Sequence, residues 1–192
     1  MRLKNRIYVM RHGQSINNVL GIESCRLETQ TPYALTEVGR EQVIQSAASA
    51  PKFDVIYSSP YRRAIETAQI MGDSQGIEVS IEFLLHEFRL PPELDQQPYE
   101  VTKAIIHNPE NDLNHTPIGD SETFDAMHSR LTNLLLEIDA KHENQSILLV
   151  SHGSPIETFI QIMENRNTGF GPFLDLPKNA HLIHLNSLNL IA

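Results

Sequence analysis

The sequence predicts an α/β fold, because short apolar segments typical of buried strands alternate with longer segments of helical pattern. The clearest strand candidates are residues 7–10, 53–57 and 147–150. Helical patterns over residues 36–50 and 120–141 lie between them. This alternation is typical of a sheet with helices packed against it.

The first strand, residues 7–10, ends at Arg11-His12-Gly13. Thr36 then opens a helical pattern that continues to about Ala50. An apolar stripe at helical spacing is expected to face the core. It consists of Val38, Val43, Ile44, Ala47 and Ala48.

The second strand, residues 53–57, leads into another helix. Ser59 is the predicted N-cap and Pro60 the first helical residue, since both residue types favour those positions. Gly72 is the predicted end of the helix. Alternating residues over 77–83 predict a third strand.

Residues 89–117 interrupt the alternation, because five prolines break the pattern there. Only residues 99–107 look helical. We therefore expect this segment to leave the sheet and to form a small cap.

The last part of the chain predicts a long helix that begins at Asp120 or Ser121 and ends near Lys141. A strand over 147–150, a helix over 155–163, a loop over 169–177 and a strand over 181–185 follow. No internal repeat or linker divides the chain, so residues 1–192 are expected to form a single domain. The apolar face of the long helix consists of Phe124, Met127, Leu131, Leu134, Leu135 and Ile138.

Composition excludes several classes of protein. The chain has 192 residues with 15 basic and 24 acidic side chains, a net charge of −9, which argues against nucleic acid as a partner. No apolar run approaches the roughly 18 residues that a membrane-spanning helix needs. With no signal-peptide core and a single cysteine, Cys25, we expect a cytoplasmic protein without a membrane partner.

Two histidine-glycine pairs stand directly after predicted strands: His12-Gly13 and His152-Gly153. In open α/β sheets ligands bind beyond the carboxyl ends of the strands, so both histidines belong where a ligand binds. The predicted strand over residues 53–57 also leads toward this edge, into a helix with Arg62 and Arg63 in its first turns. Such an arrangement predicts a phosphate pocket, because helix N-termini and guanidinium groups both favour anions.

A metal site is the competing interpretation, since the chain has nine histidines. No histidine pair stands at the i, i+4 spacing of a helical zinc site, and no cysteine cluster is present. We therefore expect neither a metal nor another cofactor.

The motifs resemble, in order, those of the histidine phosphatase superfamily. The first, Arg11-His12-Gly13-Gln14-Ser15, is similar to the family's R-H-G-[EQ]-[ST]. The resemblance implies a three-layer α/β/α architecture with a mostly parallel sheet, as in phosphoglycerate mutase. The other matching segments are Leu35-Thr36 with Gly39 and Gln42, Ser58-Ser59 with Arg63-Ala64 and Thr67, Gly119-Asp120-Ser121, and Val150-Ser151-His152-Gly153.

The resemblance implies the roles of the phosphate-binding residues. His12 would take the phosphoryl group, Arg11 and Arg63 would hold its oxygens, and His152 would complete the ring around it. Arg63 is preferred to Arg62 because the family's arginine stands directly before alanine.

The resemblance also implies residues that act on the rest of the substrate. Glu87 follows the third predicted strand, where the family's acid lies, and would protonate the leaving group. Asn18 matches a family asparagine that touches the substrate phosphate, and Gln14 lies in the same loop. Gly153 would allow substrate to approach the backbone.

We therefore expect a hydrolase of phosphomonoesters that forms a phosphohistidine, with a small phosphorylated metabolite or a phosphoprotein as substrate. One alternative is phosphoryl transfer of the phosphoglycerate mutase type; the chain lacks the tryptophan that such mutases carry after the first motif, so hydrolysis is favoured. Another alternative is a non-catalytic protein that binds a phosphorylated ligand. Specificity should reside in residues 22–32 and 89–117, and the sequence predicts no oligomeric state.

Overall fold

The computed structural model describes residues 2–106, 108, 110–166 and 176–190. Within these residues one sheet has the strand order β3-β2-β4-β1-β5. All neighbouring strands are parallel except β1 and β5, which are antiparallel. The strands are β1 (Arg6–Arg11), β2 (Val55–Ser58), β3 (Val79–Ile81), β4 (Ser146–Ser151) and β5 (Leu182–His184).

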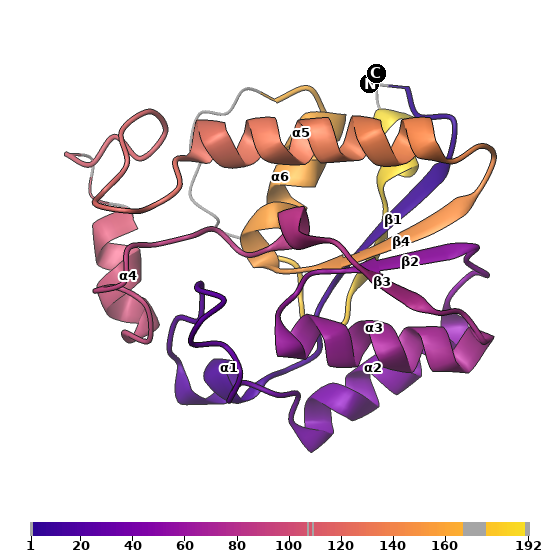
Figure 1. The fold of residues 1–192 in the computed structure, drawn as a ribbon, viewed down its shortest axis with the longest axis horizontal. Coiled ribbons are helices and arrows are strands. Elements are labelled where there is room, and N and C mark those ends of the chain that lie inside the picture. Colours follow the sequence, from indigo (N-terminus) through magenta and orange to yellow (C-terminus); the bar gives the residue numbers. More distant parts are fainter. Residues whose placement is uncertain (1, 107, 109, 167–175, 191–192) are drawn as a thin grey trace.

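Helices cover both faces of the sheet, with α5 and α6 on one side and α2 and α3 on the other (Figure 1). This confirms the predicted α/β fold with a mostly parallel central sheet. No helix in the described residues is both long enough and apolar enough to cross a bilayer. The helices are α1 (Ile16–Leu20), α2 (Glu37–Ser49), α3 (Arg62–Gln75), α4 (Tyr99–Ile106), α5 (Phe124–Lys141) and α6 (Gly153–Met163), with 3₁₀ turns η1 (Phe83–Leu85) and η2 (Leu185–Leu190).

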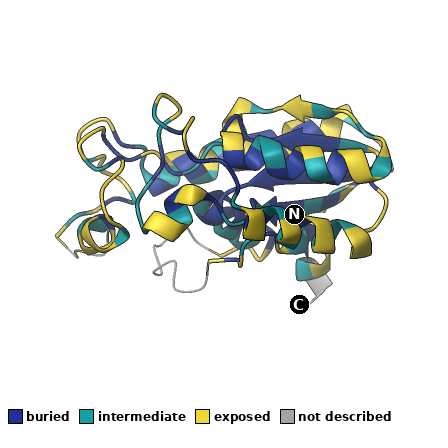
Figure 2. Cartoon of the chain, turned by 90° about the horizontal axis from the view of Figure 1, so that it is seen from below, coloured by how far each residue is buried: buried dark blue, intermediate teal, exposed yellow. Residues whose placement is uncertain are grey.

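Two apolar cores lie on opposite faces of the sheet, because successive side chains of a strand point in opposite directions. In β4, Ile147 and Leu149 join the core under α5 and α6, whereas Leu148 and Val150 join the core under α2 and α3. Figure 2 shows the buried sheet between helices whose outer faces are exposed. All six residues of the predicted α5 stripe are buried, as expected.

The predicted stripe on α2 is wrong in part. Val43 is fully buried, but Val38 is 56% exposed and Ile44 is 51% exposed. The helix approaches the loop after β1 through Gly39, where an added Cβ would lie 2.0 Å from the carbonyl oxygen of Gln14. This close backbone contact turns Val38 and Ile44 toward solvent.

The predicted ends of α3 are also wrong. The helix begins at Arg62 with Tyr61 as N-cap, so Ser59 and Pro60 precede it. It continues through Gly72 to Gln75 and ends at Gly76, whose φ of 71° is in the left-handed region that favours glycine. Gly72 has a packing reason instead, because a Cβ there would lie 2.5 Å from the Ile77 carbonyl oxygen.

The predicted start of α5 is wrong by a few residues. Thr123 is the N-cap, since its hydroxyl accepts a hydrogen bond from the Ala126 amide at 3.1 Å. The Ser121 hydroxyl instead accepts from the Ile118 amide at 2.8 Å, and Asp120 pairs with Arg26 at 3.0 Å.

The remaining elements differ mainly in length. Strand β3 is shorter than predicted, because the Glu82 carboxylate accepts from the Leu84 amide at 2.9 Å and starts η1. Helix α6 starts at Gly153, two residues earlier than predicted. Residue 107 and most of the predicted 169–177 loop lie outside the described residues.

Between η1 and α5 the chain leaves the layered body, and α4 stands apart from it in Figure 1. This segment lies beside the loop that follows α1. The Tyr99 amide donates to the Gly21 carbonyl at 2.9 Å, and the Glu23 amide donates to the Gln97 carbonyl at 2.8 Å. The loop and the segment therefore form one side of the molecule together.

Candidate active site

A cavity of about 280 Å³ opens at the carboxyl end of β1. Five of the residues predicted from the sequence line it: Arg11, His12, Asn18, Arg63 and Glu87. The structure brings these together from separate parts of the chain, at the edge of the sheet where ligands of α/β proteins bind. The sequence analysis missed other lining residues, among them Asn17, Glu23, Ser24, Tyr99, Thr102 and Lys103.

His12 is buried directly after β1, and its hydrogen bonds define its tautomer. Its Nδ1 lies 2.8 Å from the Gly13 carbonyl oxygen, which can only accept, so Nδ1 carries the proton. The unprotonated Nε2 accepts from Nε of Arg63 at 3.1 Å. Burial, with Arg63 and Arg11 nearby, lowers the pKa of His12 well below its usual value. His12 is therefore a neutral imidazole with a lone pair on Nε2.

Arg63 is buried in the first turn of α3 and holds the loop after α1. Its guanidinium donates to the hydroxyl of Ser24 at 3.1 Å and to the Ser24 carbonyl at 2.8 Å. The adjacent Arg62 points the other way, where it is exposed and pairs with Glu66 at 2.8 Å. The two neighbouring arginines thus have different environments, and only Arg63 lines the cavity.

His152 is the N-cap of α6, and its ring centroid lies 5.2 Å from that of His12. Its Nε2 is 2.7 Å from the Ser59 hydroxyl. Burial, and then the charge of Arg63, lower the pKa of His152 well below its usual value.

Two buried nitrogen atoms at this end of the sheet have no partner among the described residues, Nδ1 of His152 and Nε of Arg11. Buried polar atoms are almost always hydrogen-bonded, so each unpaired one requires an explanation. Arg11 precedes His12 in the chain, and His152 lies beside it in space. Their unpaired nitrogens are suited to donate hydrogen bonds to the oxygens of a bound anion.

Glu87 lines the cavity and lies shortly after η1. One of its carboxylate oxygens accepts from the Phe88 amide at 2.7 Å. Phe88 itself stacks on Phe124 with ring centroids 4.3 Å apart. The Glu87 carboxylate is thereby held by the amide of the next residue, beside the stacked rings of Phe88 and Phe124.

Glu23 is a second acid in the cavity, and the sequence analysis assigned it no role. Its carboxylate accepts from the Thr102 hydroxyl at 3.2 Å. Burial, and then the nearby charge of Glu87, raise the pKa of Glu23 to about 7. Glu23 lies in residues 22–32, where specificity was expected, but nothing in its local pattern pointed to the cavity.

One face of α4 completes the wall. Four of its residues line the cavity: Tyr99, Thr102, Lys103 and Ile106. They stand at positions i, i+3, i+4 and i+7 and therefore share one face of the helix, a spacing that could have been recognised in the sequence. The Tyr99 hydroxyl accepts from the side-chain amides of Asn17 at 3.2 Å and Asn18 at 3.1 Å. Helix α4 is thus tied to α1.

Three predicted residues do not line the cavity: Gln14, His152 and Gly153. The side-chain oxygen of Gln14 accepts from the Thr36 hydroxyl at 2.9 Å, at the start of α2. A Cβ at Gly153 would lie 3.1 Å from the side chain of Leu176. His152 belongs to the site through its contact with His12, whereas the placement of Gln14 and Gly153 favours structural roles.

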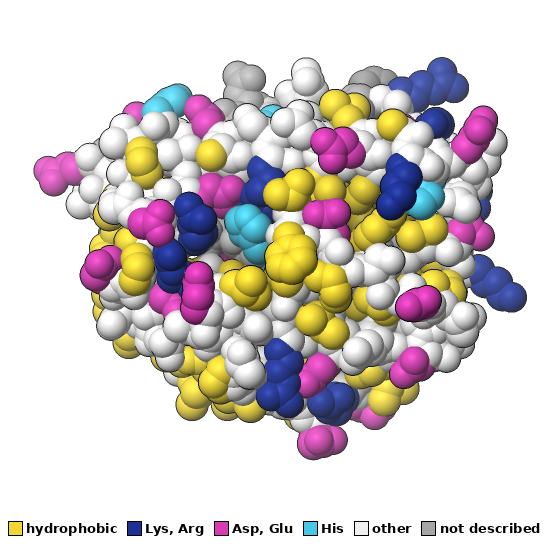
Figure 3. All heavy atoms as spheres, viewed as in Figure 1, with side chains coloured by type: hydrophobic (Ala, Val, Ile, Leu, Met, Phe, Trp, Pro, Cys, Tyr) yellow, Lys and Arg dark blue, Asp and Glu magenta, His cyan; other side chains and the backbone are white. Residues whose placement is uncertain are grey.

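No group of three His, Cys, Asp or Glu side chains in the described part of the chain is arranged to hold a metal ion. On the face drawn in Figure 3, basic and acidic side chains are interspersed rather than separated by sign. The ionisable side chains that line the cavity include an imidazole, two guanidinium groups, an ammonium group and two carboxyls.

Comparison with known proteins identifies relatives over nearly the whole chain. The model of the histidine phosphatase superfamily (branch 1) matches residues 7–188. The phosphoglycerate mutase-like protein 4 of Arabidopsis thaliana is 30% identical over 166 residues, which cover 81% of this chain and 69% of that protein. The metal-independent phosphoserine phosphatase of the same plant is 27% identical over 175 residues, 85% of this chain and 71% of that protein.

A solved structure has the same fold. The mycobacterial glucosyl-3-phosphoglycerate phosphatase in complex with VO3 has a TM-score of 0.77 and 25% identity, and the match covers 92% of this chain and 88% of that chain. These relatives carry names of phosphatases or of mutase-like proteins, in agreement with the imidazole and guanidinium groups at the cavity.

Proposed function

This chain belongs to branch 1 of the histidine phosphatase superfamily and is a phosphoric monoester hydrolase, and from that premise we propose that it hydrolyses small phosphorylated metabolites through a phosphohistidine at His12. The observation that carries the proposal is the state of His12. Its Nε2 is unprotonated, and the lone pair on that atom accepts a hydrogen bond from Arg63 at 3.1 Å inside the cavity.

In the first step, Nε2 of His12 attacks phosphorus and the bond from phosphorus to the ester oxygen breaks. Arg63 then shifts its hydrogen bond from Nε2 to a phosphoryl oxygen, while the unpaired nitrogens of Arg11 and His152 take the others. Glu87, protonated at this stage, transfers its proton to the departing oxygen, so that the product leaves as an alcohol.

In the second step, water attacks the phosphohistidine. Glu87, now a carboxylate, accepts the proton from that water, and the bond from phosphorus to Nε2 breaks. Inorganic phosphate leaves, His12 is again neutral and Glu87 is again protonated, so the cycle closes without a cofactor.

The part of the cavity wall that comes from α4 and from the loop after α1 supports a small substrate with several polar groups. Lys103 provides a cation there, and Glu23 with Thr102 and Tyr99 provides hydrogen-bonding groups. Phosphoserine and glucosyl-3-phosphoglycerate, the substrates in the names of two relatives, both combine a phosphate with a carboxylate. We include this class, a phosphomonoester with a carboxylate on its leaving group, in the proposal, with residues 89–117 as the cap.

The test is to trap the intermediate. Wild-type protein is mixed briefly with a phosphomonoester labelled in the phosphate, denatured in alkali, and analysed for acid-labile label. We expect label on His12, none in His12→Ala, and wild-type labelling in His115→Asn, because His115 is exposed.

Parallel assays measure inorganic phosphate release and the interconversion of 2- and 3-phosphoglycerate. Release without interconversion supports hydrolysis, whereas interconversion would show that the phosphoryl group returns to substrate, as in a mutase. A folded protein that binds phosphorylated ligands but never becomes labelled would overturn the proposal.

A further inference from the structure

We propose that Arg130 and Glu122 form a clamp that positions Glu87 for proton transfer, an inference that rests on the proposed function. Neither residue lines the cavity. Arg130 lies on α5, and Glu122 lies just before that helix. Both are therefore positioning residues that act through Glu87.

The first half of the clamp is a two-pronged ion pair. Nε of Arg130 lies 2.7 Å from one oxygen of Glu122, and a terminal nitrogen of Arg130 lies 2.8 Å from the other. The side chains are only 10% and 9% exposed. Such paired contacts fix the plane of the guanidinium group as well as its position.

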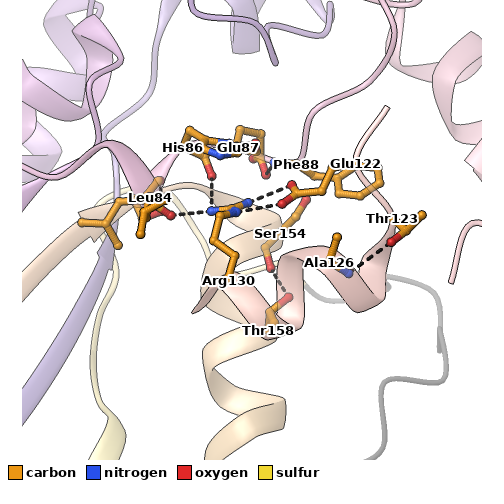
Figure 4. Close-up of polar contacts among 12 residues, drawn as sticks. Leu84, His86, Glu87, Phe88, Glu122, Thr123, Ala126, Arg130, Ser154 and Thr158 are labelled. Carbon is orange, nitrogen blue, oxygen red and sulfur yellow. Dashed lines mark hydrogen bonds and ion pairs between the residues drawn. The ribbon is translucent and has the colours of Figure 1, made fainter. Parts of the chain in front are cut away.

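The second half of the clamp holds the backbone that leads into Glu87 (Figure 4). The remaining terminal nitrogen of Arg130 donates to the carbonyl oxygens of Leu84 and, at 3.4 Å, His86. The carbonyl between them, that of Leu85, accepts from the Ser151 hydroxyl at 2.7 Å. Three consecutive carbonyl groups before Glu87 are thus held by side chains.

Glu122 holds the chain on the other side of Glu87. Its backbone amide donates to the Arg89 carbonyl at 2.7 Å. The segment that carries Glu87 is therefore tied at one end to Arg130 on α5 and at the other to Glu122, just before that helix. That helix is fixed to the sheet by its buried apolar face, so the clamp has a rigid base.

A buried ion pair is a weak source of stability, because the loss of hydration of both charges offsets their attraction. It does specify geometry, since each member has one arrangement that satisfies its hydrogen bonds. An acid that gives up a proton must be held close to its productive position. The placement of this pair around a single short segment is what assigns it to Glu87.

The experiment compares two substrates that depend differently on proton donation. An alkyl phosphate such as phosphoserine needs its leaving oxygen protonated, whereas p-nitrophenyl phosphate has a leaving group that departs as an anion. For Arg130→Gln we expect kcat/KM, which covers only the steps up to phosphoryl transfer to His12, to fall about tenfold on the alkyl ester and less than about twofold on the aryl ester, a part of what proton transfer contributes.

Several variants serve as references. Glu87→Gln should give the same selective loss, only larger. Arg130→Lys, which keeps the charge but not the fork, should recover part of the alkyl activity. Arg166→Gln, which removes an exposed arginine paired with Glu157 at 3.3 Å, should leave both activities unchanged. Thermal unfolding shows that each variant is folded.

Equal losses on both substrates in folded Arg130→Gln, or no loss on either, would overturn the clamp while the selectivity of Glu87→Gln stands. If Glu87→Gln itself loses both activities equally, Glu87 is not the acid; this part of the proposed mechanism then fails and the clamp fails with it. Labelling of His12 in wild type is independent of either outcome.

Discussion

The two sides of the cavity are built differently. The side that we assign to phosphate consists of buried residues at the ends of regular elements, with His12 after β1 and Arg63 in the first turn of α3. A second part of the wall, the α4 side, consists of a loop residue, Glu23, and of residues on α4 such as the exposed Lys103. The phosphate side is buried, and we propose that it receives the group that all substrates share, whereas the α4 side includes exposed residues and would receive the part in which substrates differ. The roles that we propose in phosphate binding and in substrate selection are thereby assigned to differently built parts of the wall.

The most severe test of this comparison is Arg63→Lys. A lysine cannot contact His12 and both acceptors of Ser24 at once, so we expect kcat to fall on the order of 100-fold with every phosphomonoester. Arg62→Lys, in the neighbouring exposed position, should change kcat less than about twofold. Steady-state kinetics on several esters measure both, and a loss confined to one ester would mean that the phosphate side also selects substrates.

The second test asks whether the α4 side really buries an acid. The pKa of Glu23 is about 7 in the folded protein and 4.5 without burial. Above pH 4.5 the unfolded chain loses this proton while the folded one keeps it, so the free energy of unfolding should fall by about 3 kcal/mol as pH rises from 4.5 to 7.

Glu23→Gln should remove this decrease, and Glu28→Gln, which changes an exposed neighbour, should not. The readout is urea unfolding at several pH values, taken as the difference between variant and wild type. The buried histidines titrate in the opposite sense, since their lowered pKa values reduce stability as pH falls below 6.5, and the difference cancels them. An unchanged pH dependence in Glu23→Gln would show that this side is open to water.

The smallest effect is expected for Lys103→Met. An exposed cation contributes little, so KM for phosphoserine should rise about fivefold, roughly 1 kcal/mol, with kcat unchanged. KM for p-nitrophenyl phosphate, which lacks a carboxylate, should stay the same. Lys52→Met is the matched control on the surface. A change in kcat instead of KM would show that the α4 side also takes part in the reaction, which contradicts the comparison.

The part of the site that could be predicted is the part encoded locally. His12 and Arg63 each stand at a strand or helix end that short sequence patterns reveal. The stripe of α5 was predictable for the same reason, since six residues at helical spacing face one core. The start of α5 was missed because Asp120, Ser121 and Thr123 are all good caps, and only tertiary contacts choose among them.

The α4 side could not be predicted, because it depends on contacts between distant segments. Glu23 reaches the cavity since its backbone pairs with Gln97, and Tyr99 pairs with Gly21. No local pattern specifies such pairing. Likewise, glycine is typical of a helix end, so the sequence favours an end at Gly72. The structure shows that glycine stands there because the Ile77 carbonyl oxygen lies too close for a Cβ, while the helix continues.

The position of β1 between β4 and β5 affects how the protein is made. During translation β1 emerges well before the strands that satisfy its backbone, which begin only at residues 146 and 182. The carbonyls of Arg11 and His12 accept from the Ala180 amide at 3.0 and 3.2 Å. Until those residues have been added, the nascent chain therefore carries an apolar strand with open edges, a target for chaperones, and His12 takes its final place only after the ribosome has added residue 180.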